Sequence, residues 1–222
     1  MCKDAIRFHE EAERRVATTL QAVENGVEPA SGDRVRIIGY DFDAEDYSYS
    51  ALPDKYLTIP GQAVTIMDGE EVADRFEAFI HAPFKDDCAE ARNDTSLAMQ
   101  ITLRHPEAGT EGYVLLFGDL AYATIKKIFE FSSSRRPERL RWDVMLSAHH
   151  CSKKVMYATG DDGEEELKRD ILDDFEKYAQ PEAYVVASSM PFPESDKPGA
   201  NPHMSRPATG TRRSRQTGAV HG

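Results

Sequence analysis

Apolar and polar residues recur along this chain at two different spacings, which predict helices and strands. Residues 4–25 place Ile6, Val16 and Leu20 near helical spacing among charged residues, and Asn25-Gly26 supplies a stop signal. Residues 97–103 instead alternate apolar and smaller or polar side chains, which predicts a half-buried strand. Further strands are predicted at residues 34–40, 64–67, 113–118, 142–147 and 184–189, and further helices at residues 121–131 and 164–178.

The order of these elements predicts the fold class. Antiparallel strands come first and a strand–helix–strand–helix–strand series follows, so we expect an α/β (α+β) protein with a mixed sheet and flanking helices. We divide the chain into an amphipathic helix at residues 1–31, one domain at residues 32–204 and a tail at residues 205–222. The tail is basic and lacks an apolar period, so we expect it to be disordered.

Composition and charge narrow the classes of function. The chain has 222 residues and a net charge of −12, and its acidic body repels a phosphate backbone at long range. Nonspecific nucleic-acid binding by the whole surface is therefore not expected. No apolar run approaches the ~20 residues that cross a bilayer, and three cysteines without CxxC spacing argue against a disulfide framework. We expect a cytoplasmic protein that does not contact membranes.

Two apolar strands end on residues that can bind metal ions. Residues 113–117 run into Gly118-Asp119, and residues 142–148 run into His149-His150. Carboxylate oxygen and imidazole nitrogen at one end of a sheet are donors from which divalent-metal hydrolases build their sites. Adjacent residues of an extended strand point to opposite faces, so at most one of the two histidines easily reaches a given metal. The alternative is an Asp119 that is solvated or caps the next helix, beside two ordinary loop histidines.

Other polar residues lie close to these motifs in the sequence. Residues 152–154 (Ser-Lys-Lys) either contact an anionic substrate or form a polar loop, and Cys151 is interpreted as a small buried thiol. Asn93 and Ser96 flank a turn signal whose side chains can hold metal-bearing loops by hydrogen bonds. His203 follows the last predicted strand and either returns over the site or belongs to the disordered tail.

The ordered series of motifs resembles the metallo-β-lactamase fold. The series consists of Asn93–Ser96, Leu115–Asp119, Asp143–Ser152 and Ala183–Ser189. It is most similar to the soluble hydrolase domain of bacterial competence (DNA-uptake) channel proteins, over roughly residues 32–204. The resemblance implies an αββα sandwich, of which this chain would hold the second half. It also implies that a metal-activated hydroxide attacks a phosphodiester or similar bond.

The resemblance implies roles for individual residues as well. Asp119 would bridge two divalent metals, and one of His149 and His150, with His149 preferred, would bind the second metal. The supporting or substrate-contacting residues would be Asn93, Ser96, Ser152 and His203. The metals would be zinc or manganese if the site is retained, and the chain would hold none if it is not.

One part of the family's pattern is absent from the printed sequence. The His-x-His-x-Asp-His run that supplies most of the metal ligands does not occur, and Cys151 stands where the family has glycine. We therefore expect a metal-dependent hydrolase that is incomplete as this chain. It would act on a phosphodiester or other small anionic substrate and would pair with a second copy or with a missing N-terminal half. The alternative is a non-catalytic interaction or scaffold protein of the same origin. A half-sandwich would expose a broad apolar sheet face.

Overall fold

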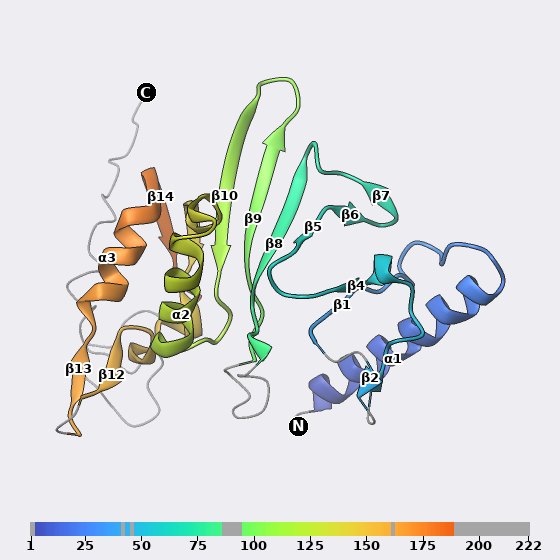
Figure 1. Ribbon diagram of the computed structural model, residues 1–222, viewed down its shortest axis with the longest axis horizontal. Coiled ribbons are helices and arrows are strands. Elements are labelled where there is room, and N and C mark those ends of the chain that lie inside the picture. Colours follow the sequence, from blue (N-terminus) through green and yellow to red (C-terminus); the bar gives the residue numbers. More distant parts are fainter. Residues whose placement is uncertain (1–2, 41–42, 45–46, 86–94, 161–162, 189–222) are drawn as a thin grey trace, which may run out of the picture.

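The computed structural model describes residues 3–40, 43–44, 47–85, 95–160 and 163–188. Its centre is a mixed six-stranded sheet in the order β14-β11-β10-β9-β8-β5 (Figure 1). The strands are β5 (Ala63–Val64), β8 (Phe76–Ala82), β9 (Ala98–His105), β10 (Thr110–Leu116), β11 (Trp142–Leu146) and β14 (Ala179–Val186). Strands β5, β8, β9 and β10 pair antiparallel, whereas β10, β11 and β14 run parallel. The chain is therefore an α+β protein with a mixed sheet, as the order of its elements predicts.

Three α-helices occur in the described part of the chain, and two of them cover the sheet. They are α1 (Lys3–Glu24), α2 (Tyr122–Ser133) and α3 (Arg169–Tyr178). Helix α2 connects β10 to β11, α3 leads into β14, and both lie on one face of the sheet (Figure 1). Their aromatic residues meet Phe117 there, in a cluster of Phe117, Phe129, Phe175 and Tyr178 whose neighbouring ring centroids lie 5.5–5.9 Å apart. Phe117, Phe129 and Tyr178 belong to the main core, and the partly buried Phe175 packs against it.

The remaining described strands form short pairs outside the central sheet. They are β1 (Ile37–Ile38) with β4 (Leu57–Thr58), β2 (Asp43–Ala44) with β3 (Tyr47–Ser48), β6 (Ile66–Met67) with β7 (Glu70–Glu71), and β12 (Tyr157–Thr159) with β13 (Glu165–Leu167). Helix α1 packs Val16 against Leu52 and Tyr56 in a separate apolar cluster. The helix predicted at residues 1–31 therefore packs its apolar side against residues near the start of the domain predicted at 32–204.

The element boundaries confirm most of the sequence pattern and correct part of it. The prediction that a helix begins at residue 164 is wrong, because α3 begins at Arg169 and residues 165–167 form β13. Leu167 reaches the main core from that strand, so one apolar position satisfied both patterns. The last strand begins at Ala179 instead of residue 184, next to an irregular register between β11 and β14. The tail at residues 205–222 lies outside the described residues.

None of the helices in the described part of the chain combines the length and the apolar character that a membrane-spanning helix needs.

His81 of β8 is buried between the sheet and α2, with 6% of its surface exposed. Its Nε2–H donates to the carbonyl oxygen of Arg139 at 2.9 Å, so Nδ1 carries no proton and faces the Ser132 hydroxyl at 3.5 Å. Burial, together with the nearby charges of Arg136 and Arg139, lowers the pKa of His81 to about 4. The fold therefore holds this imidazole neutral.

The low pKa of His81 predicts a loss of stability in mild acid. The unfolded chain takes up a proton near pH 6.5 and the folded chain only near pH 4, so protonation favours unfolding between these values. The contribution is constant above about pH 6.5, and roughly 2–3 kcal/mol is lost as the pH falls to 4. In urea unfolding, the free energy of unfolding should therefore fall more steeply with decreasing pH for the wild type than for His81→Gln, whose amide can still donate to Arg139. An equal fall for both proteins would contradict this account.

Candidate metal site at the strand ends

The register of the three parallel strands brings the predicted motifs to one edge of the sheet. Leu116 of β10 pairs with Leu146 of β11, which pairs in turn with Val186 of β14. The segments that follow these residues leave the sheet side by side. They carry Gly118-Asp119, His149-His150 and Ala187-Ser188. The strand ends thus place a carboxylate, two imidazoles and a hydroxyl at the same edge.

Asp119 and His150 are the two side chains with possible metal-donor atoms that this edge brings close together. The Oδ1 atom of Asp119 lies 3.6 Å from Nε2 of His150, and the two side chains are 44% and 53% exposed. The other ring nitrogen of His150, Nδ1, lies 3.3 Å from the hydroxyl oxygen of Ser188. Ser188 is therefore a site residue that sequence reasoning missed. Its only sequence signal is its place directly after the third parallel strand.

His149 lies in a different environment from His150. Its backbone N–H donates to the carbonyl oxygen of Gly118 at 2.9 Å, which ties the two strand-end loops together. Its Nδ1 atom is buried and finds no hydrogen-bond partner within the described residues. A histidine that binds a metal usually donates its second ring N–H to an acceptor. His150, with Ser188 beside it, has this arrangement, whereas His149, which the resemblance prefers, does not.

The backbone at the two histidines is not extended. Residues His149, His150 and Cys151 have φ values of 47°, 52° and 62°, which places all three in the left-handed region. The opposite-face argument for neighbouring strand residues therefore does not apply here. Each such residue costs about 1–2 kcal/mol when it carries a Cβ atom. Backbone strain of this kind clusters at functional sites, because surrounding interactions must hold it in place.

Gly118 also adopts a conformation that favours glycine, with φ of 55°. A Cβ atom at this position would lie 3.0 Å from Cβ of Ser96 and 3.2 Å from the carbonyl oxygen of Leu97. Ser96 therefore packs directly against the loop that presents Asp119. Asn93 and His203, which the resemblance names with Ser96, lie outside the described residues.

Local hydrogen bonds describe the surroundings of three of these residues. Helix α2 has Ala121 at its N-cap position and receives no side-chain cap, so the interpretation of Asp119 as a helix cap is wrong. The Ser152 hydroxyl accepts the backbone N–H of Lys154 at 3.4 Å and begins a short turn at Lys153–Val155. The half-buried Cys151 thiol donates to the Ser147 hydroxyl at 3.1 Å.

The donor atoms of this edge supply part of a metal site. Within the described ranges, no three His, Cys, Asp or Glu side chains lie close enough to hold a metal ion. A catalytic zinc site has three protein ligands and an open position, so Asp119 and His150 would supply two of the three. The chain matches no family model, no curated protein and no solved structure. Functional interpretation therefore depends on the geometry of this pair.

The left-handed conformation of Cys151 predicts that glycine is the preferred residue there. We expect Cys151→Gly to raise the free energy of unfolding by about 1 kcal/mol relative to Cys151→Ala. Both variants lose the contact with Ser147, so the comparison isolates the backbone strain of a Cβ atom at φ of 62°. Chemical denaturation of both proteins measures the difference, and an alanine variant as stable as the glycine variant would refute the assignment.

Proposed function

We propose that this chain binds a divalent metal ion, zinc or manganese, between Asp119 and His150. We further propose that it belongs to the metal-dependent hydrolases of the metallo-β-lactamase type and acts on a phosphodiester or similar anionic substrate. The observation that carries the proposal is the 3.6 Å approach of Asp119 Oδ1 and His150 Nε2 at the shared strand edge. The resemblance of the motif series supports the choice of family.

The distance between the two donor atoms suits a single metal ion. Metal bonds to carboxylate oxygen and imidazole nitrogen are about 2.0–2.2 Å long. Two such bonds at the tetrahedral angle of about 109° separate their donor atoms by about 3.4 Å. The observed separation of 3.6 Å is close to this value. Ser188 supports the same interpretation, because its hydroxyl can accept the Nδ1–H of His150 and so leave Nε2 free to bind.

The remaining features of the edge fit a hydrolytic site. Both side chains are open to solvent, so water and an anionic substrate can reach them. A bound divalent ion would lower the pKa of a coordinated water molecule and polarise the scissile bond. We propose that the missing ligand comes from beyond the described residues, either from another part of this chain or from a partner chain. The mixed sheet with two helices on one face suits half of an αββα sandwich.

Metal binding tests the proposal directly. We expect the full chain to bind about one Zn²⁺ or Mn²⁺ ion by isothermal titration, and Asp119→Asn and His150→Gln to weaken binding at least tenfold. Ser188→Ala should weaken it by a smaller factor, because it removes only the orienting hydroxyl. His105→Gln is the matched control, since this exposed histidine lies in the β9–β10 hairpin at the opposite end of the sheet. Equal metal affinity of the His150→Gln and His105→Gln variants would exclude a metal site at Asp119 and His150.

A second candidate function, an interaction protein, is favoured by the other face of the sheet. Two rows of paired residues cross four strands on the face opposite α2 and α3. The rows are Ile101, Val114, Val144 and Tyr184, and Met99, Leu116, Leu146 and Val186. Every position is apolar, and Tyr184 and Val186 are 59% and 47% exposed. The other six residues are half-buried, and exposed apolar residues on one sheet face can mark an interaction site. A second copy of the chain can present the same face in a symmetric dimer.

Self-association tests the second candidate. We expect light scattering to show a concentration-dependent dimer for the wild type, and a monomer for the double variant Tyr184→Lys/Val186→Lys. The matched control is Phe8→Lys, which changes a residue that is 78% exposed on α1, away from the two rows. A wild type that stays monomeric at high concentration would count against a dimer through this face.

A further inference from the structure

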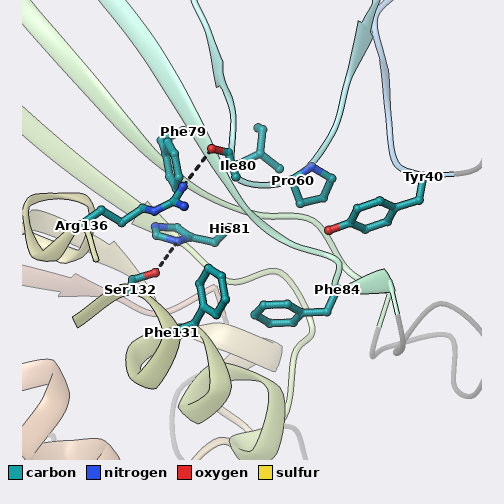
Figure 2. Close-up of a pocket in the computed structure, with 10 residues that line it drawn as sticks. Tyr40, Pro60, Phe79, Ile80, His81, Phe84, Phe131, Ser132 and Arg136 are labelled. Atoms are coloured by element: carbon teal, nitrogen blue, oxygen red, sulfur yellow. Dashed lines mark hydrogen bonds between the residues drawn. The ribbon is translucent and has the colours of Figure 1, made fainter. Parts of the chain in front are cut away.

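A cavity of about 130 Å³ lies beside β8, toward the opposite edge of the sheet from β11 and β14. Figure 2 shows it between Tyr40 and Pro60 on one side and the end of α2 on the other. Phe84 and Phe131 form an aromatic wall, with ring centroids 6.3 Å apart in an edge-to-face arrangement. The cavity contains no residue of the Asp119–His150 pair. It is therefore a separate feature of the molecule.

Arg136 gives the cavity a positive charge. Its guanidinium donates to the carbonyl oxygen of Gly61 at 2.9 Å and lies 5.1 Å from the ring centroid of Phe79. No carboxylate within the described ranges pairs with it. The neighbouring Arg139 differs, because Glu77 neutralises its charge. Arg136 thus retains donor groups and a full charge that an anion in the cavity can use.

The inner end of the cavity is polar but uncharged. His81 is held neutral, and its Nδ1 atom faces the Ser132 hydroxyl at 3.5 Å, the outer limit of a hydrogen bond. Ser132 itself is 3% exposed and lines the cavity. Its hydroxyl group can turn toward a ligand, because the contact with His81 is long. A second hydrogen-bonding group is therefore available next to Phe131 on α2.

The volume sets the size of the ligand. A cavity of about 150 Å³ lined by apolar side chains accepts a benzene ring, and this one is slightly smaller at about 130 Å³. Nucleotides and peptides need the several hundred cubic ångströms of ordinary ligand pockets. One six-membered ring fits, provided that its charged substituent points to Arg136.

We propose that this cavity binds a small aromatic monoanion of the size of benzoate. Its ring lies against Phe84, Phe131 and Pro60, and its carboxylate pairs with Arg136. Aromatic walls favour a planar ring over an aliphatic one, and the guanidinium fork matches a carboxylate. This site goes beyond the proposed metal-dependent activity, which uses none of its residues.

Isothermal titration of the full chain with benzoate tests the proposal. We expect saturable binding with a dissociation constant of about 0.1–1 mM, an affinity that a ligand of nine non-hydrogen atoms can reach. Benzamide, which keeps the ring and loses the charge, should bind at least tenfold more weakly, and so should cyclohexanecarboxylate. Equal binding of benzoate and benzamide, or no binding of benzoate at 10 mM, would overturn the proposal; the latter limit is about ten times the weakest expected constant.

Variants assign any binding to the cavity. We expect Arg136→Gln, whose amide can still donate to Gly61, to weaken the binding of benzoate at least tenfold and to leave the binding of benzamide unchanged. Arg136→Lys should retain part of the affinity, because it keeps the charge. Arg141→Gln is the matched control on an exposed arginine outside the cavity lining. Circular dichroism establishes that each variant is folded. Unchanged benzoate binding by a folded Arg136→Gln protein would refute the assignment.

Discussion

The parallel alignment of β10, β11 and β14 fixes the positions of Asp119, His149 and His150 at the strand ends. Leu116, Leu146 and Val186 stand in one row, so the three following loops begin at the same height on the sheet. Helices α2 and α3 impose this alignment, because parallel neighbours need crossover connections that pack on a face of the sheet. Their aromatic contacts around Phe117 hold the strands in that register. The contact of Asp119 with His150 depends on this core, although neither residue belongs to it.

The turn that carries the two histidines is strained, and its neighbours keep it in place. Three successive left-handed residues would relax to ordinary conformations if the chain were free to move. Backbone hydrogen bonds prevent this at both ends of the turn. Ser147 N–H donates to Val186, His149 N–H donates to Gly118, and Ser152 N–H donates back to His149. Each partner lies on a strand end or its loop, so the same parallel register that aligns the strands also maintains the conformation of the turn.

Periodicity and strand-end motifs predicted the parts of this structure that depend on local sequence. The mixed sheet, the helices α1 and α2 and the meeting of Asp119 with one of the two histidines followed from apolar spacing and from the order of the elements. The left-handed turn did not, because no glycine marks it; the resemblance preferred His149, whereas His150 is the histidine that meets Asp119. The cavity beside β8 was equally hidden, since Tyr40, His81 and Arg136 meet only through tertiary packing. Ambiguity also remained wherever one apolar residue served two patterns, as Leu167 does.

The two faces of the sheet connect the candidate functions. On one face Leu115 and Met145 are buried under α2 and α3, while their sequence neighbours on the other face form the apolar rows. The row of Leu116, Leu146 and Val186 ends where the loops of the proposed metal site begin. A partner that covered this row would therefore lie next to the loops that carry Asp119 and His150. If such a partner brought a further metal ligand, the two candidate functions would be one function, because burial of the apolar face would complete the coordination of the metal. Metal affinity and association would then rise together, since each would stabilise the same assembled state.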